Sequence, residues 1–396
     1  CIFYPSIGLS GIISEMVKLP EFISYLKLRT SYTEVGSPIT QTGITPGTVT
    51  DPMSGGVINP ISTYPYPDFK PERTKSYEVG INARFLNGRI SFDGTFYQSN
   101  TYNQTFLSVM SPATGYSGFY VQAGNVRNRG VEMTLGYNDT FGKVNYSTHL
   151  TYTANQNKIV EMVHDYRNPI DNSLVNITEL TLKEAGDVYL REGYSMSDVF
   201  TTGILQRGRD GKLVEEGNGY QVDRSQRIRL GSADPDFTMG WRHDINYKNI
   251  SLGLMITGRF GGIVTSQTQA FMDAFGVSKV SAEARDNGGV MLDGHRYDAE
   301  RYYNTVGGQG LMSYYTYDAT NVRLQELSLT YSLPKKWLGD VFNNATISFV
   351  GRNLFMFYRK APFDPDMNGS TGTYNRSDFF MAPSLRNLGF SIKFSL

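Results

Sequence analysis

The chain contains little of the material from which several common functional sites are built. Its 396 residues include one cysteine, four histidines and two tryptophans, and 37 Lys and Arg are balanced by 37 Asp and Glu. A single cysteine excludes a disulfide framework and a cysteine-rich zinc module. A formal net charge of zero removes the positive surface that attracts nucleic acid, so we expect no nucleic-acid partner.

Long apolar segments and catalytic motifs are missing too. No run approaches the roughly 18 apolar residues of a membrane-spanning helix, which excludes a helical membrane protein. No Gly-x-Ser-x-Gly, phosphate loop or dinucleotide fingerprint occurs, and the four histidines lack the spacing of metal ligands. We therefore expect neither an enzyme nor a bound cofactor. The histidines are His149, His164, His243 and His295.

Aromatic residues and glycine are abundant instead. Phe, Trp and Tyr make up 13% of the chain and 41 residues are Gly, a mix that favours β structure. Residues 77–85 and 90–96 alternate apolar and polar side chains on either side of Asn87-Gly88. This dipeptide between two alternating runs is a strong signal for a β-hairpin.

The alternation predicts roughly eleven strands, joined in turn by short and long connections. Short turns at one end and long loops at the other are the layout of a bacterial outer-membrane β-barrel, which is therefore the expected all-β fold. The expected strands cover about residues 2–14, 24–36, 77–85, 90–97, 131–137, 144–152, 237–247, 250–256, 321–333, 343–356 and 385–396. The long segments cover about residues 37–72, 103–128, 158–234, 264–320 and 357–384.

The alternation also assigns side chains to the two faces of the barrel wall. One face is expected to contact lipid and the other to line the lumen, either along a translocation path or in a polar network on the wall. The expected lipid-facing residues of one strand are Val79, Ile81, Ala83 and Phe85. The expected lumen-facing residues are Glu78, Asn82, Arg84, Asp93, Glu132, Arg242 and Asp244.

An odd number of strands has a consequence for domain organisation. Complete single-chain bacterial barrels have an even number of strands. An open sheet cannot lie in lipid, because the N–H and C=O groups of its edges would be unpaired. The sequence therefore predicts that residues 1–396 are the C-terminal portion of a larger barrel.

Several short segments, in order along nearly the whole chain, carry a family resemblance. They are Phe3-Tyr4-Pro5-Ser6, Ile13-Ser14-Glu15, Leu26 to Tyr32, Lys70 to Gly80, Ala123 to Glu132, Asp234-Pro235-Asp236-Phe237, Val322 to Leu329 with Tyr331 and Pro334, Gly351-Arg352-Asn353-Leu354, and Phe363-Asp364-Pro365-Asp366. In these segments the chain resembles the SusC-like TonB-dependent transporters of the outer membrane of Bacteroidetes.

The resemblance implies an antiparallel transmembrane barrel of about 22 strands, of which this chain holds about the last eleven. It implies long extracellular loops, short periplasmic turns, and a plug and N-terminal strands outside residues 1–396. The implied function is TonB-dependent import of oligomeric nutrients, either glycan fragments or peptides. The implied partners are a SusD-like surface lipoprotein, the TonB–ExbB–ExbD complex reached through the N-terminal part, and the outer-membrane lipid.

Other functions fit the same residues. Within transporters, a siderophore-type TonB-dependent receptor and a passive porin are the nearest alternatives. A secreted β-rich glycan-binding module is the alternative from another class, because tyrosine-rich loops would serve it equally well.

Aromatic residues in the long segments are candidates for contact with substrate or partner, since their faces pack against sugar rings or peptide side chains. Packing within the loops is the alternative role. The candidates are Tyr64, Tyr66, Tyr116, Phe119, Tyr120, Tyr302, Tyr303, Tyr314, Tyr315 and Tyr317.

One segment is similar to the first half of a calcium-binding loop. Asp364, Asp366 and Asn368 supply oxygen atoms at alternate positions, and Gly369 occupies the sixth position. The twelfth position is Asn375, which cannot supply a bidentate carboxylate. A capped turn is therefore the alternative interpretation, and calcium is the only cation that the sequence suggests.

Overall fold

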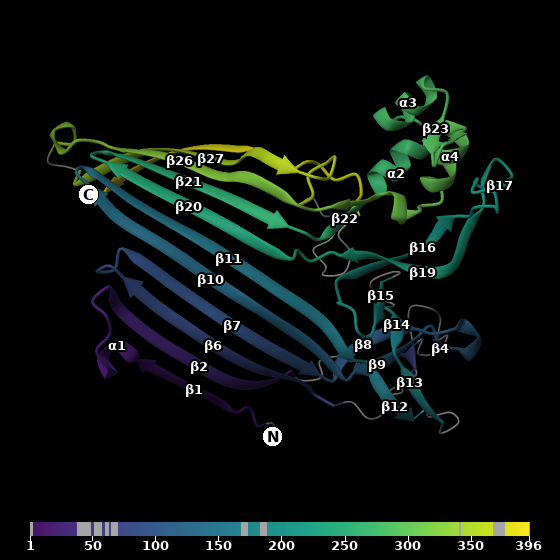
Figure 1. Ribbon diagram of the computed structural model, residues 1–396, viewed down its shortest axis with the longest axis horizontal. Helices are drawn as coiled ribbons and strands as arrows, with labels where there is room; N and C mark the ends of the chain where they lie inside the picture. Colours follow the sequence, from purple (N-terminus) through teal and green to yellow (C-terminus); the bar gives the residue numbers. More distant parts are fainter. Residues whose placement is uncertain are drawn as a thin grey trace.

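The computed structural model describes residues 3–37, 49–50, 58–59, 63–64, 70–167, 173–182, 188–339, 342–366 and 377–395. Eleven of the described strands form one sheet, as expected (Figure 1). Each of them pairs with the sheet strands that come before and after it along the chain. The strands are β1 (Ser6–Ile12), β2 (Ile23–Ser37), β6 (Glu72–Phe85), β7 (Ile90–Tyr102), β10 (Asn125–Phe141), β11 (Val144–Glu161), β20 (Phe237–Tyr247), β21 (Ile250–Phe260), β26 (Asn321–Ser332), β27 (Asn344–Arg359) and β29 (Asn387–Ser395). All their pairings are antiparallel.

Short connections join these strands at one end of the sheet. Between β6 and β7, Leu86, Asn87 and Gly88 have φ angles of 52°, 57° and 84°. That left-handed backbone explains the Asn-Gly pair, because these residues tolerate positive φ better than most others. The short helix α1 (Ile13–Met16) lies at the same end, between β1 and β2.

Strands β10 and β11 are longer than the alternation predicts, at 17 and 18 residues. About 9 to 11 residues cross a bilayer, so this hairpin continues beyond it toward the long connections. Its outer part carries polar residues on both faces, so the apolar–polar alternation does not continue there and does not predict this part of the strands. The backbone pairing nevertheless continues there, with Arg129 opposite Gln156.

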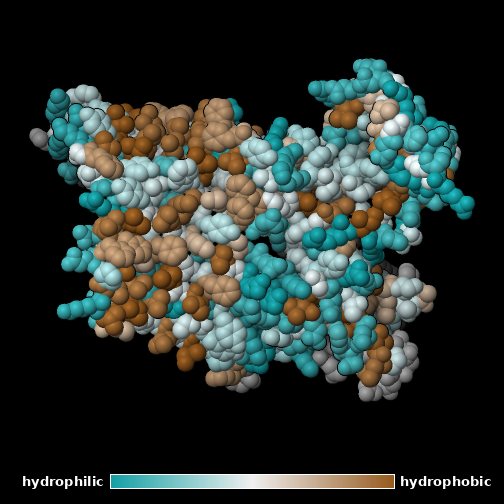
Figure 2. All heavy atoms as spheres, in the orientation of Figure 1, coloured by the Kyte–Doolittle hydropathy of each residue, from teal (hydrophilic) through white to brown (hydrophobic). Residues whose placement is uncertain are grey.

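The sheet has one apolar and one polar face, in the register that the alternation predicts. On the apolar face Leu135 lies opposite Phe92 and Leu150, and Leu150 lies opposite Trp241. Apolar side chains remain exposed there, and Figure 2 shows them gathered over the strands. Ala83 shares this face, yet it is only 2% exposed because it lies between the larger Leu26 and Phe92.

The long connections fold into small strands and helices at the other end of the sheet (Figure 1). None of the described helices is long and apolar enough to span a membrane. The strands are β3 (Val49–Thr50), β4 (Ile58–Asn59), β5 (Thr63–Tyr64), β8 (Gln104–Val109), β9 (Gly118–Ala123), β12 (Val163–Arg167), β13 (Leu174–Ile177), β14 (Glu179–Thr181), β15 (Tyr189–Arg191), β16 (Asp198–Leu205), β17 (Glu215–Glu216), β18 (Gly219–Tyr220), β19 (Val222–Ser232), β22 (Ile263–Ser266), β23 (Val290–Leu292), β24 (His295–Tyr297), β25 (Thr316–Asp318) and β28 (Ser377–Asp378). The helices are α2 (Gln267–Ala274), α3 (Lys279–Asp286) and α4 (Ala299–Val306), and single 3-10 turns cover Pro112–Thr114 and Met312–Tyr314. A further 3-10 turn, Lys335–Trp337, lies in the short connection between β26 and β27.

Candidate functional site at the long-loop end

Three helices and their connections make a small folded unit, which we call the helical lobe (residues 267–314). A side-chain oxygen caps the N-terminus of each helix: Ser266 for α2, Ser278 for α3 and Asp298 for α4. The core contains Val306 and Leu311, which are 1% and 0% exposed. The sequence alternation predicts only a long loop here. The caps and the spacing of the buried residues of α4 are signals that could have revealed it.

A second unit, the strand lobe, is formed by β8, β9 and β12 to β15. Its core includes Ile159, Met162 and Leu190, all at most 1% exposed. At its surface His164 Nε2 lies 2.9 Å from Glu192 Oε2. The hydrogen bond to Glu192 raises the pKa of His164 above its usual value, and the same bond lowers the pKa of Glu192.

A cavity of about 720 Å³ lies where the ribbon of β16 and β19 meets the two lobes. Helix α2 contributes Phe271 to its wall, and the turn after α4 contributes residues 307–310. The glycines of this turn permit close packing, since a Cβ on Gly307 would lie 2.3 Å from the carbonyl oxygen of Ala270. The volume is in the range of ordinary ligand pockets.

The cavity has polar and aromatic walls. Tyr189 and Phe200 meet edge to face with their ring centroids 5.0 Å apart. Arg224 and Arg227 reach the cavity from β19. Its described lining holds one carboxylate, Asp198, whose Oδ1 accepts a hydrogen bond from Arg229 at 2.7 Å. The sequence does not single out these residues, because the cavity lining comes from segments that are distant in the chain, such as β15, β19 and α2.

A second cavity of about 490 Å³ lies beside the first, at the outer end of β11. Asn155, Asn157 and Asp234 are among its lining residues. The segment Asp234-Pro235-Asp236, which carries part of the family resemblance, therefore lies at the wall of this cavity. Asp198 lines both cavities, and its ion-pair partner Arg229 lines the second one.

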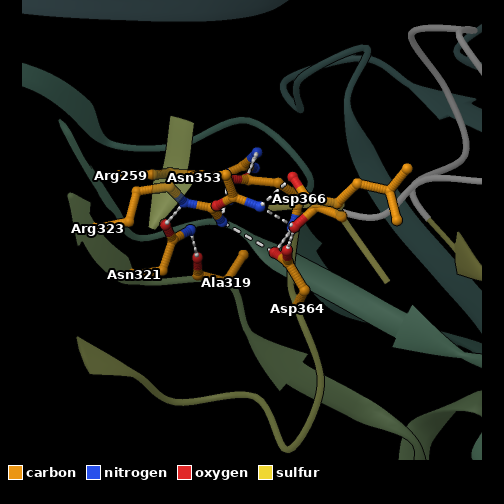
Figure 3. Close-up of polar contacts among 9 residues, drawn as sticks. Arg259, Ala319, Asn321, Arg323, Asn353, Asp364 and Asp366 are labelled. Atoms are coloured by element: carbon orange, nitrogen blue, oxygen red, sulfur yellow. Dashed lines mark hydrogen bonds and ion pairs between the residues drawn. The ribbon is translucent and has the colours of Figure 1, made fainter. Parts of the chain in front are cut away.

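The segment that is similar to a calcium loop lies at the junction of the sheet and the long connections (Figure 3). Arg323 of β26, whose side chain is 6% exposed, contacts Asp364 at 2.9 Å and Asp366 at 2.6 Å. Ser384 also donates a hydrogen bond to Asp364. Guanidinium and hydroxyl donors thus take the oxygen atoms that a cation would need, so these residues do not fit a calcium site. Asn368 lies outside the described residues.

Burial and hydrogen bonding act in opposite directions on Asp364. Burial by itself would raise the pKa of this carboxyl, but hydrogen bonds from Ser384 and Arg323 hold it below its usual value. The carboxylate therefore remains charged, and it anchors the segment after β27 to the sheet.

The structure separates the aromatic candidates into buried and accessible groups. Tyr302 and Tyr303 lie in the core of the helical lobe, and Tyr315, directly after the lobe, packs into the same core; they are 8%, 8% and 3% exposed. Burial raises the pKa of all three hydroxyls. Tyr317 packs edge to face on Phe363 at the junction. These four rings are occupied by packing within the protein.

The remaining candidates lie nearer the surface. Tyr64 and Tyr116 form an edge-to-face pair with centroids 5.1 Å apart. Phe119 and Tyr120 lie on β9, and Phe119 packs partly against the core of the strand lobe. Tyr314 is 36% exposed, and its hydroxyl accepts a hydrogen bond from the backbone of Leu205. Tyr66 lies outside the described residues.

The polar face of the sheet carries a network of charges and hydrogen bonds. Arg29 contacts both carboxylate oxygens of Asp93, at 3.1 and 2.8 Å, and Asn82 donates to the same carboxylate at 2.7 Å. Arg242 and Asp244 form a further pair on this face at 2.8 Å. The expected lumen-facing residues thus include cross-strand and same-strand pairs that fix the wall.

These features define a class of protein. An antiparallel sheet with an exposed apolar face, a polar face, short turns at one end and long folded loops at the other is the wall of an outer-membrane β-barrel. Residues 3–257 match the family model described as TonB dependent receptor-like, beta-barrel. The chain belongs to this family and is located in the bacterial outer membrane, and the predicted resemblance to TonB-dependent transporters is confirmed.

Individual relatives and solved structures agree with this assignment. TonB-dependent receptor P3 of Formosa agariphila is 24% identical in an alignment that covers 99% of this chain. TonB-dependent receptor P26 of the same organism is 25% identical over 92% of this chain. A structure of the RagAB peptide transporter matches 99% of the chain with a TM-score of 0.72 at 16% identity. The chain spans 42% and 39% of the two relatives and 43% of that solved chain.

Proposed function

We propose that this chain supplies the C-terminal part of the barrel of an importer for oligomeric nutrients, powered through TonB–ExbB–ExbD. The observation that carries the proposal is the folded long-loop end, which holds a cavity of about 720 Å³. This end belongs to a sheet that has one apolar and one polar face. Loops on a rigid scaffold are where binding concentrates. The cavity is large enough for several sugar units or amino acids, and glycan fragments are the proposed substrates, with peptides as the alternative.

The proposal includes a SusD-like surface lipoprotein that closes over the loops. A stable protein interface buries about 1,600 Å² in total, which requires several loops acting together. The long-loop end offers such a surface, because both lobes project there (Figure 1). The fold similarity to the RagAB peptide transporter is consistent with an importer of oligomers.

Accessible aromatic residues are the proposed contacts at this end. Tyr64, Tyr116, Tyr120 and Tyr314 have rings or hydroxyls near the surface, where they can meet substrate or lipoprotein. The buried Tyr302, Tyr303 and Tyr315 are proposed instead to hold the helical lobe in shape. We assign Asp364 and Asp366 the role of anchors for the junction, with no cation.

Deletion of the helical lobe from the full-length protein tests the proposal. Ser266 N donates a hydrogen bond to the carbonyl oxygen of Tyr315 at 2.9 Å, so a short Gly-Ser linker can replace residues 267–314. We expect the variant to assemble as a heat-modifiable barrel, because no strand of the sheet is removed. Capture of the lipoprotein in affinity co-purification should fall, and growth on the imported oligomer should be lost.

Two controls distinguish the alternatives. Uptake by the wild-type protein should disappear when TonB is removed, whereas uptake that persists would indicate a passive porin. Growth that depends on a ferric siderophore, with no dependence on any oligomer, would indicate a siderophore receptor. Undiminished lipoprotein capture and growth after removal of the helical lobe would contradict the proposed role of the long-loop end.

A further inference from the structure

The larger cavity carries positive charge that its described surroundings do not neutralise. Of the three arginines of β19, Arg229 is paired with Asp198 at 2.7 Å. Arg224 and Arg227 have no carboxylate within ion-pair distance among the described residues, and both line the cavity. Asp198 does not compensate them, because its two oxygens accept from Arg229 and from the backbone N–H of Ser195.

Neutral groups hold these two guanidinium groups in place. Arg227 lies over the ring of Tyr189, 4.1 Å from its centroid, and donates to Thr181 Oγ1 at 3.2 Å. Arg224 donates to the carbonyl oxygens of Thr202 and Gln309 at 3.3 and 3.2 Å. Stacking and neutral acceptors fix the orientation of a guanidinium and leave its charge available for an anion.

The remaining donors are sufficient for a bidentate contact. A guanidinium has five N–H donors in a planar fork that matches the oxygens of carboxylate, sulfate or phosphate groups. Arg227 directs one of its nitrogens to Thr181, and Arg224 directs two to backbone and side-chain oxygens. Both therefore retain donors for a ligand.

The other walls favour a carbohydrate over a peptide. Thr201, Thr265 and Gln267 bring hydroxyl and amide groups that match the many hydroxyls of a sugar. Phe271 borders the cavity and lies 6.0 and 5.9 Å from the rings of Phe379 and Phe380, all three exposed. Exposed aromatic faces beside hydrogen-bonding groups suit the apolar faces and the hydroxyl edges of sugar rings.

We propose that this cavity binds an acidic oligosaccharide, with Arg224 and Arg227 contacting its carboxylate or sulfate groups and Phe271 packing against a sugar ring. The inference rests on the proposed import function and names the substrate class of the same site. It predicts that the anionic group is required for tight binding and that affinity falls as the salt concentration rises.

Binding to the purified full-length protein with its lipoprotein tests this assignment. The probes are a galacturonic acid hexamer, its methyl ester, a sulfated galactose hexamer, the unsulfated galactose hexamer and a glutamate hexapeptide, measured by isothermal titration calorimetry. The paired probes distinguish a carboxylate from a sulfate ligand. Each acidic sugar that fits should bind at least about tenfold more tightly than its neutral partner, which is typical of charge-assisted hydrogen bonds.

The variant R224Q/R227Q should weaken binding of the acidic hexamer about 10-fold to 100-fold and leave the weak binding of the neutral hexamer unchanged. R224K/R227K should recover part of the affinity, because the charge remains while the planar fork is lost. Arg209→Gln is the control, since it removes one arginine charge from an exposed position outside the cavity lining and should bind like the wild type.

The outcomes separate this inference from the proposed function. Equal affinity for charged and neutral hexamers, unchanged binding by R224Q/R227Q, or preference for the glutamate hexapeptide would each overturn the acidic-sugar assignment. TonB-dependent uptake of a neutral oligosaccharide would overturn it as well, while the import function would stand. The import function itself is tested by deletion of the gene, which should abolish oligomer uptake. Unchanged oligomer uptake after this deletion would refute the proposed function.

Discussion

The sheet and the long-loop end differ in where their large apolar side chains lie. In the sheet, large apolar side chains point outward and stay exposed, such as Val79 at 57% and Phe390 at 69%. Each lobe instead encloses an apolar core, in which Leu190 and Leu311 are 0% exposed. The difference reflects the surroundings of each part: the lobes have ordinary cores, whereas lipid covers the apolar face of the sheet.

The same comparison extends to polar residues. On the sheet, the charges form short pairs across the polar face, such as Arg29 with Asp93. At the long-loop end, Arg224 and Arg227 lack such partners among the described residues. Charges that are paired within a wall stabilise the wall, whereas charges left over at the edge of a cavity are available to a ligand.

The largest expected effect is at the junction that connects the two regions. Arg323→Leu should destabilise the segment after β27 by about 3–5 kcal/mol, because it leaves the buried Asp364 without its partner. Arg352→Leu is the matched control, since Arg352 is 65% exposed in its pair with Glu326 and should cost about 0–1 kcal/mol. Limited proteolysis of the full-length barrel measures both, and equal protection would contradict the assignment.

The pH dependence of this junction follows from the lowered pKa of Asp364. The charged carboxylate contributes stability above the ordinary pKa of 3.8, and this contribution is lost as the pH falls through the lower folded value. Arg323→Leu should move that loss to higher pH, because burial then acts with less compensation. Proteolysis as a function of pH checks the direction of the change.

The core of the helical lobe should be the next most sensitive. Leu311→Ala should destabilise the lobe by about 2–5 kcal/mol, as expected for a large residue truncated in a packed core. Hydrogen exchange should increase in residues 267–314 and remain unchanged in the sheet. Equal increases in both regions would show that the lobe and the sheet unfold as one unit.

The orientation of the sheet faces is tested by a pair of neighbouring residues. Ile81→Lys should cost about 2–4 kcal/mol near the middle of the membrane, whereas Asn82→Lys should cost much less. The Asn82 side chain already donates to Asp93 at 2.7 Å, and a lysine there retains a donor for this carboxylate. Heat-modifiability and urea unfolding of the full-length barrel measure the two variants, and comparable losses would contradict the register.

The smallest expected effect concerns the surface of the strand lobe. Since the hydrogen bond to Glu192 raises the pKa of His164, its NMR titration midpoint should lie above 6.5. Glu192→Gln should return the midpoint toward that value. The pair stabilises the lobe below pH 6.5, and the contribution is lost as the pH rises through the folded pKa. A midpoint unaffected by Glu192→Gln would show that the pair does not form in solution.

The sequence by itself determined the sheet. Alternation along each strand repeats every two residues, and a strand in a membrane wall faces two different environments, so the pattern reports the face of each side chain. The alternation in residues 77–85 and 90–96 therefore predicted the hairpin of β6 and β7 and its two faces, although β6 begins earlier, at Glu72, and β7 ends later, at Tyr102. The short turns and the number of strands in the sheet followed from the same local information.

Only the tertiary structure decided the long-loop end. Helix α4 is short, and two of its four apolar residues are tyrosines. The sequence is therefore equally compatible with Tyr302 and Tyr303 as surface contacts or as core residues. The ion pairs at Asp364 and Asp366 depend on Arg323, about forty residues earlier in the chain. The cavity likewise requires β15, β16, β19 and α2 to meet. These contacts join residues that are distant in sequence, and no local periodicity records which of them become neighbours.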